Sequence, residues 1–357
     1  MTKTLFTPIR IGDVTLQNRI AMAPMTRNRS PGAVPNDLNA LYYGQRGTAG
    51  LVITEGVTPD AGGRGYIDIP GLYDAAQVAG WRKVAGAVHA KGGKVFVQLM
   101  HTGRISHPDF LDGGTPVAPS AVAARGDIFT KTGPKPMPVP RALDASEIPA
   151  VIATYGRAAT LAVEAGLDGV EIHGANGYLP SQFLSTNANL RTDEWGGSVE
   201  NRVRFLLGAV RAAAEAIGPG RVGVRVSPGS TFNDIADTDP EATLTAIANA
   251  LRGQGLAYLH LVGGAYGYDA AGIARRIFDG PVILNGGYDA ARSEADLAAG
   301  RADLIAFGSS FLANPDLPER LRTGAALNAP DATTFYGGDA RGYTDYPTLA
   351  EVDAAAE

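Results

Sequence analysis

Several short apolar runs in this sequence end on polar side chains whose types could do chemistry. The run at residues 168–174 contains His173 and is followed by Asn176 and Tyr178, and the run at residues 222–228 contains Arg225. His173 and Asn176 are three residues apart at the start of an expected helical turn, so their side chains can face one point. These donors, a cation and a phenol could bind a hydrogen-bonding ligand and exchange protons with it.

The elements that must position these residues repeat along the chain. Eight apolar runs are each closed by a Gly, Pro or polar cluster, and Ala-rich helical stretches lie between them, for example at residues 74–89 and 201–217. The runs are residues 19–24, 51–56, 94–100, 168–174, 222–228, 257–263, 281–287 and 303–309. Alternation of short strands with helices is typical of βαβ units and a parallel sheet. Eight such units predict an α/β fold, a (β/α)8 TIM barrel.

In such barrels the active site lies at the carboxyl ends of the strands. The residues at those ends are Thr26, Gly56, Gln98, His173, Asn176, Tyr178, Arg225, Gly286, Gly287, Gly308 and Ser309. The glycines after the seventh and eighth strands stand where barrels commonly bind phosphate with backbone N–H groups. Gln98 and Arg225 would point from the barrel mouth at a planar, hydrogen-bonding ligand. The sequence therefore predicts a ligand with a phosphate group, bound at these glycines, and a planar part, bound at Gln98 and Arg225.

Composition excludes several other classes of protein. The 357 residues include 31 Lys and Arg against 36 Asp and Glu, a formal net charge of −5, and no cysteine. Nucleic acid and anionic membranes would require a basic face, so neither is an expected partner. Without cysteine there is no thiolate nucleophile, disulfide or iron–sulfur cluster. No signal-peptide core or run of 18 apolar residues is present, so we expect one cytoplasmic domain over residues 1–357.

Two segments do not fit an ideal barrel. Residues 4–18 read as an N-terminal hairpin around Gly12 and Asp13, which could cover the bottom of the barrel. Residues 103–143 are far longer than an ordinary βα connection, so we expect a functional lid after strand 3. The G-x-G-x-x-G match at residues 218–223 precedes a strand instead of following one, which argues against a dinucleotide-binding turn. His101 and His107 are expected to form hydrogen bonds within the lid.

Five motifs in this order resemble the old yellow enzyme family of FMN-dependent ene-reductases. They are APMTR at residues 23–27, QLMHTGRIS at 98–106, HGANGYL at 173–179, RTDEWGGSVENR at 191–202 and FLANPDL at 311–317. The likeness extends from Leu5 to FYGG at 335–338 and GYTDYP at 342–347. It implies an FMN cofactor, NADPH or NADH as hydride donor, and activated alkenes such as α,β-unsaturated carbonyl or nitro compounds as substrates.

The resemblance also implies a role for each residue that matches the family's motifs. His173 and Asn176 would donate to the oxygen of the substrate's activating group, and Tyr178 would be the proton donor. Arg225 would stabilise the reduced ring near N1 and O2, and the Thr26 hydroxyl would donate to flavin O4. The remaining cofactor contacts would be Pro24, Met25, Gly56 and Gln98 at the ring and Gly286, Gly287, Gly308 and Ser309 at the phosphate. Tyr66, Met100 and Tyr336 would line the substrate pocket.

The chain departs from the family pattern at three of these positions. Thr26 and the absence of cysteine place it with the classical branch, yet Met100 stands where members often have Trp, and Asn176 where some have a second His. At Ser309 the family usually has an Arg that holds the phosphate, so weaker phosphate binding is expected. Other cations near these loops in the sequence are Arg275, Arg276 and Arg292.

Two other functions remain open from the sequence. One is a metal-dependent barrel hydrolase that uses some of His101, His107, His173 and His260. No Asp or Glu follows these histidines at ligand spacing, which disfavours it. The other is a flavin-binding barrel with little turnover, suggested by Ser309. Either a monomer or a dimer is compatible with the sequence.

Overall fold

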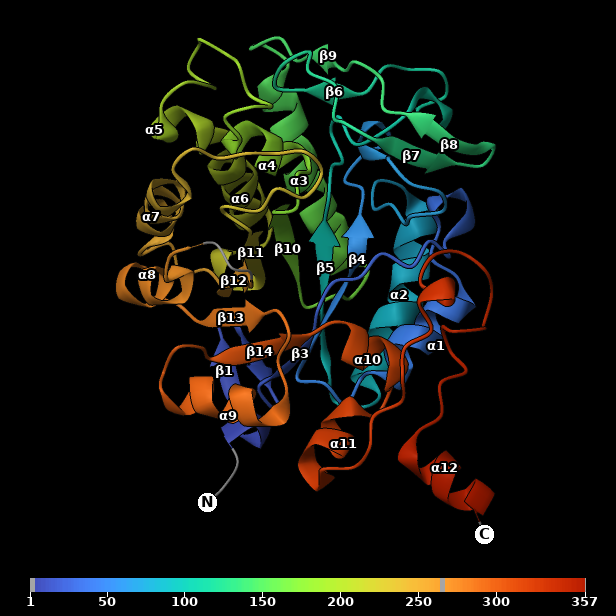
Figure 1. Cartoon of the computed structure of the whole chain (residues 1–357). Helices are drawn as coiled ribbons and strands as arrows, with labels where there is room; N and C mark the ends of the chain where they lie inside the picture. Colours follow the sequence, from blue (N-terminus) through green and yellow to red (C-terminus); the bar gives the residue numbers. More distant parts are fainter. Residues whose placement is uncertain (1–3, 264–266, 357) are drawn as a thin grey trace.

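Eight parallel strands form a closed barrel in the computed structural model, which describes residues 4–263 and 267–356 (Figure 1). Around the barrel the order is β10-β11-β12-β13-β14-β3-β4-β5. The strands are β3 (Ile20–Met22), β4 (Leu51–Val57), β5 (Lys94–Leu99), β10 (Gly169–Gly174), β11 (Val222–Val226), β12 (Tyr258–Val262), β13 (Val282–Asn285) and β14 (Leu304–Phe307). Each lies within, or within one residue of, a predicted run, so the predicted (β/α)8 barrel is confirmed.

Helices surround the barrel and connect its strands. The longer ones are α1 (Asp37–Gln45), α2 (Ala75–His89), α3 (Ile148–Glu164), α6 (Arg204–Ile217), α7 (Pro240–Leu251), α8 (Ala270–Ile277), α9 (Ala290–Ala298) and α12 (Leu349–Ala356). Shorter ones are α4 (Leu179–Leu184), α5 (Val199–Arg202), α10 (Ser309–Ala313) and α11 (Leu317–Thr323). Asp74 and Gln77 form a capping box that starts α2 one residue after the expected boundary. The helix expected over residues 201–217 is divided at Val203 into α5 and α6.

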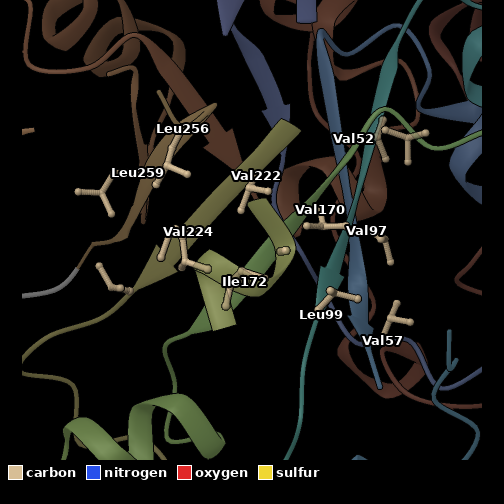
Figure 2. Close-up of a cluster of buried hydrophobic side chains, with 14 of the residues drawn as sticks. Val52, Val57, Val97, Leu99, Val170, Ile172, Val222, Val224, Leu256 and Leu259 are labelled. Atoms are coloured by element: carbon tan, nitrogen blue, oxygen red, sulfur yellow. The ribbon is translucent and has the colours of Figure 1, made fainter. Parts of the chain in front are cut away.

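Side chains along each barrel strand alternate between two environments, as strand geometry requires. In β5, Val97 and Leu99 belong to the large buried cluster shown in Figure 2. The same cluster also contains helix side chains such as Trp81. Phe96 belongs to a second cluster, made of barrel and hairpin residues. Gln98, two residues after Phe96 and on the same face of the strand, lines the cavity at the barrel mouth. Along each strand, the residues that face this cavity thus alternate with the residues that pack against the helices.

A short antiparallel hairpin, β1 (Ile9–Ile11) and β2 (Val14–Leu16), precedes the barrel. Ile11, Val14 and Leu16 are buried in the inner cluster with residues from the barrel strands. Gly12 has φ +48°, and a Cβ there would lie 2.2 Å from the carbonyl oxygen of Gly220. Glycine is therefore needed for the turn to approach this loop. The hairpin packs against the amino-terminal side of the barrel and leaves the carboxyl ends of the strands as the open mouth.

The segment between β5 and α3 carries small sheets of its own above the barrel mouth (Figure 1). Strands β7 (Asp127–Thr130) and β8 (Gly133–Pro136) form an antiparallel hairpin, and β6 (Val117–Ala118) pairs with β9 (Arg141–Ala142). Phe129, on β7, is 72% exposed and lines a chamber next to the mouth. The role of this segment as a lid stays a prediction.

A buried arginine fastens the C-terminal segment to the barrel mouth. The Arg27 guanidinium donates to the carbonyl oxygens of Phe335 (2.9 Å) and Gly342 (2.7 Å). It also lies over the rings of Tyr42 and Tyr343, which stack on each other with centroids 4.0 Å apart. These contacts hold Phe335 and its neighbour Tyr336 over the cavity. In the described part of the chain, no helix has the length and apolar character needed to cross a membrane.

Candidate active site

The carboxyl ends of the strands surround a cavity of about 360 Å³. It gathers most of the residues that the sequence singled out, from six of the eight strands or the loops that follow them. Those that line it are Pro24, Met25, Thr26, Gly56, Gln98, Met100, His173, Asn176, Tyr178, Arg225, Gly308, Ser309 and Tyr336. The predicted catalytic set therefore shares one space with most of the predicted cofactor-binding set.

Three predicted residues lie next to this cavity and not in its wall. Tyr66 lines an adjoining chamber of about 940 Å³ that shares Thr26, Tyr178 and Tyr336 with the first. Gly286 and Gly287 directly follow a lining residue, Asn285. The sequence reasoning also missed lining residues: Ala23, Phe232, Asn285, Leu312 and Phe335. Of these, Asn285 ends strand β13, so the strand-end rule could have found it.

His173 and Asn176 hold their side chains in the cavity by different means. Burial, reinforced by Arg225, lowers the pKa of His173 well below its ordinary value, so the imidazole is neutral. Its Nδ1 atom is buried and has no hydrogen-bond partner among the described residues. Asn176 has φ +58°, and its backbone N–H donates to Ser227 Oγ at 2.9 Å while its carbonyl accepts from Asn233 at 2.8 Å. Both side chains are thus available to a ligand.

Tyr178 is a buried phenol whose proton is held firmly. Its hydroxyl lies 3.0 Å from the hydroxyl of Tyr66, and either oxygen can be the donor. Burial raises the pKa of Tyr178 above its ordinary value near 10, although the hydrogen bond from Tyr66 opposes this shift. Its proton is therefore present throughout the neutral range and can be given to a strongly basic carbon.

A buried polar chain that the sequence analysis did not identify fixes Gln98. Gln98 Nε2 donates to Glu171 Oε1 at 2.7 Å, and His260 Nδ1 lies 2.8 Å from the other carboxylate oxygen. Burial by itself would raise the pKa of Glu171, but His260, Arg225 and Gln98 together bring it below the ordinary value. The carboxylate is therefore ionised and can only accept hydrogen bonds. This sets the orientation of the Gln98 amide, with Nε2 toward Glu171.

Arg225 provides a cation in the wall of this cavity. It lies opposite His173 in the β10–β11 register and opposite His260 in the β11–β12 register. Its guanidinium donates to Asn285 Oδ1 at 3.1 Å, and Asn285 Nδ2 in turn donates to the carbonyl of Ala306 at 2.8 Å. These bonds hold a fixed positive charge where it can stabilise an anionic ring system.

The other end of the site is built from the loop after β13 and from the start of α10. Ser309 and Gly287 are exposed, and Gly286 has φ +126°, which side-chain-bearing residues rarely adopt. A Cβ on Gly263 would lie 2.3 Å from the carbonyl oxygen of Asn285, so the loops after β12 and β13 come very close. Gln98, Arg225 and Thr26 offer an amide, a guanidinium and a hydroxyl to a planar ring, and the glycine loops offer backbone N–H groups to a phosphate. Together these groups fit a flavin mononucleotide.

Three of the four histidines considered as metal ligands have other partners. His101 Nδ1 accepts from the backbone N–H of Gly103 (3.1 Å) and His107 Nδ1 from that of Asp109 (3.2 Å), local hydrogen bonds as predicted. His260 is bonded to Glu171. Over residues 4–263 and 267–356, no three His, Cys, Asp or Glu residues are grouped as a metal site would need.

Comparison with known proteins shows the family to which the chain belongs. The model of the NADH:flavin oxidoreductase / NADH oxidase family matches residues 4–328. A probable flavin mononucleotide-dependent alkene reductase of Leishmania infantum is 42% identical over 96% of both chains. The structure of morphinone reductase is similar with a TM-score of 0.95 and 47% identity, covering 99% of this chain and 98% of that one. The old yellow enzyme homologue from Zymomonas mobilis has a TM-score of 0.94 and 40% identity, covering 97% and 100%. The chain belongs to this family, that of the old yellow enzymes, FMN-dependent NAD(P)H oxidoreductases that act on alkenes.

Proposed function

We propose that this cavity reduces the activated C=C bond of α,β-unsaturated carbonyl or nitro compounds, with His173, Asn176 and Tyr178 acting on the substrate. The observation that carries the proposal is that these three side chains line the same cavity as Gln98 and Arg225. FMN bound in this cavity would supply the hydride-transfer chemistry between NADPH or NADH and the alkene. Family membership supports both the cofactor and the nicotinamide donor.

The cofactor would be held by groups from opposite sides of the barrel. Gln98 and Arg225, both buried and fixed by hydrogen bonds, would bind the polar edge of the ring. Thr26 would donate to it, and Pro24, Met25 and Gly56 would pack against it. The phosphate would lie at the exposed loops, bound by N–H groups of Gly286, Gly287 and Gly308 and by Ser309.

His173 and Asn176 would activate the substrate by binding the oxygen of its carbonyl or nitro group. Negative charge develops on that oxygen during the reduction, so two preorganised donors lower the barrier. A neutral His173 still carries one ring N–H to donate. Tyr178 would then give its proton to the α-carbon, and Tyr66, at 3.0 Å, can return a proton to the Tyr178 oxygen.

The substrate would extend from the donor pair into the adjoining chamber. Met100 and Tyr336 line the cavity, Tyr66 lines the chamber, and the β7–β8 hairpin covers the chamber with Phe129. This arrangement supports a lid role for residues 103–143 and room for bulky alkenes. We further propose that the whole chain, residues 1–357, acts as one domain in the cytoplasm, as a monomer or dimer.

Stopped-flow measurement of the two half-reactions tests the function. The purified protein should be yellow, should bleach under anaerobic conditions with NADPH or NADH, and should regain colour when a cyclic enone is added. Bleaching without recovery would instead support the flavin-binding barrel with little turnover. A colourless protein that cannot be loaded with FMN would contradict the proposal entirely.

A further inference from the structure

We propose that Arg292 supplies the positive charge for the FMN phosphate, in place of the family's arginine at the position of Ser309. Ser309 cannot provide a charge, and Arg225 is engaged with Asn285 at the ring end of the site. Yet a phosphate dianion bound only by neutral donors lacks the charge-assisted bonds that usually hold it. The inference rests on FMN binding in this cavity, as proposed above, and concerns affinity, not turnover.

Arg292 lies on the loop that would bind the phosphate. It is in the first turn of α9, and its Nη1 atom reaches back to donate to the carbonyl oxygens of Gly286 (3.0 Å) and Gly287 (3.3 Å). Its guanidinium carbon is 4.1 Å from the centroid of the Tyr288 ring, which fixes the direction of the side chain. The positive charge of Arg292 is therefore held next to the two glycines after β13.

This charge is not neutralised by a carboxylate, unlike that of nearby arginines. Arg275 is 2.5 Å from Asp303, and Arg301 is 2.8 Å from Asp269. For Arg292, no carboxylate oxygen within the described ranges lies within 4.0 Å of the guanidinium, and its bonds go to neutral carbonyls. Arg292 thus keeps its positive charge beside this loop with no carboxylate in direct contact, although Asp296 lines the same small cavity.

The contacts of Arg292 also improve the loop as an anion site. A cation bonded to the carbonyl oxygens of Gly286 and Gly287 offsets their negative partial charge, which would otherwise repel a phosphate. It also polarises the peptides, so that their N–H groups become stronger donors. A second contribution is direct Coulombic attraction, which extends over about 10 Å at 0.1 M salt. Arg292 would thereby bring a positive charge to the phosphate from the side of β13, whereas the family's arginine brings it from the side of β14.

Titration of apo-protein with FMN and with riboflavin, followed by quenching of flavin fluorescence, tests this role. Riboflavin has the same ring but no phosphate. Arg292→Gln should weaken FMN binding about tenfold, the low end of the roughly one to two decades that a charge-assisted hydrogen bond contributes, and should leave riboflavin binding unchanged. The FMN effect should shrink as salt is added. Arg275→Gln is the matched control, because it removes the same charge from α8, where Asp303 already neutralises it.

Combination with Ser309→Arg provides a second test. In the Arg292→Gln background, Ser309→Arg should restore FMN affinity, and the gain should exceed that seen when Arg292 is present. Arg292→Lys should retain most of the affinity, because the charge remains. Equal losses of FMN and riboflavin affinity in Arg292→Gln would mean that Arg292 only shapes the loop, and an unchanged FMN affinity would mean that it has no role. Both results overturn the inference, whereas the proposed alkene reduction is tested independently by the stopped-flow measurement on the FMN-loaded wild-type protein.

Discussion

The two ends of the active site are built in opposite ways. At the substrate end, His173 and Gln98 are each 2% exposed, lie on barrel strands and are surrounded by buried hydrogen bonds or charges. At the phosphate end, Gly287 and Ser309 are exposed; Gly287 lies in the loop after β13, and Ser309 is the first residue of the short helix α10. Backbone N–H groups from any residue can bind a phosphate, whereas stabilising charge on one substrate oxygen needs particular side chains. The strands therefore determine the chemistry, and the loops can change sequence as long as some cation remains.

This contrast predicts that substitutions at the two ends of the active site have different effects. A substitution among the buried groups should lower the rate of one chemical step, because those groups act where charge develops in the transition state. A substitution at the exposed loops should change cofactor affinity in a salt-dependent way, as proposed for Arg292.

The largest effect is expected from Tyr178→Phe, which removes the proton donor. Loss of a general acid typically costs roughly 10²–10⁴-fold in rate, and here it should slow alkene reduction while leaving flavin reduction by NADPH nearly intact. Stopped-flow traces of the two half-reactions measure each separately. Tyr66→Phe is the comparison, because it leaves the Tyr178 hydroxyl in place and removes its hydrogen-bonding partner, the group that can return a proton to it. It should cost much less. If flavin reduction fell as far as alkene turnover, Tyr178 would not be the proton donor.

The next largest effect concerns the donor pair. Loss of one such donor, in His173→Ala or Asn176→Ala, should slow enone reduction by about 10²–10³-fold. Both variants should also lose affinity for phenols, because a phenolate oxygen resembles the developing enolate. The wild-type protein should give a long-wavelength charge-transfer band with a phenol, and titration of that band measures the affinity. Absence of the band in the wild-type protein would count heavily against the pair.

The sequence predicted the barrel and the substrate end well, for one physical reason. In a parallel barrel, the strand ends meet at one rim, so polar residues such as Gln98, His173 and Arg225 could be placed together without knowing any contact. The same rule failed for groups inside the barrel. Glu171 lies two positions before His173 on β10, so alternation places it on the same face, and His260 lies opposite Arg225 in the β11–β12 register. Searching that face for charged residues could have found the bond from Gln98 to Glu171.

The phosphate end and the rim were harder to predict. Phe335 reaches the cavity because Arg27 and Arg29 bind the C-terminal segment, and the bond from Arg27 to Phe335 joins residues 308 positions apart. Arg292 was one of three cations near the loops in sequence, and nothing in its spacing showed that it would bind the carbonyl oxygens of Gly286 and Gly287 and not a carboxylate. Long-range contacts and side-chain direction on exposed loops are decided by packing, which a local pattern does not contain.

Acidification tests the buried end through stability. Burial lowers the pKa of both His173 and His260 below the ordinary value near 6.5, so the unfolded chain binds more protons once the pH falls below 6.5. Stability should therefore be fully present above that pH and be lost as pH falls, at up to about 1.4 kcal/mol per pH unit for each histidine. Urea unfolding of the apo-protein at pH 7.5, 6.5 and 5.5 measures the loss.

His173→Asn should reduce the slope of the unfolding free energy against pH, while His107→Gln, on the partly exposed loop, is the control. Equal stability at pH 7.5 and 5.5 would show that both histidines are protonated without cost.

The smallest expected effect lies where the buried end meets the substrate chamber. Met100 is buried with Ile69, Ile105 and Tyr178, and its Sδ and Cε atoms lie 2.5 Å from the position that a Cβ on Gly56 would take. The flexible thioether thus fills the space above Gly56 and can move aside for a bulky substrate. A rigid indole in Met100→Trp cannot, so the ratio of activities on a bulky β-substituted enone and a small enone should fall, by about tenfold if the bulkier group loses one contact worth 1–2 kcal/mol. Met100→Leu, similar in volume, should keep the ratio, and steady-state kinetics with both enones measures it. The same ratio before and after Met100→Trp would show that substrates do not press on this wall, and the limit on their size would then have to lie farther out, beneath the β7–β8 hairpin.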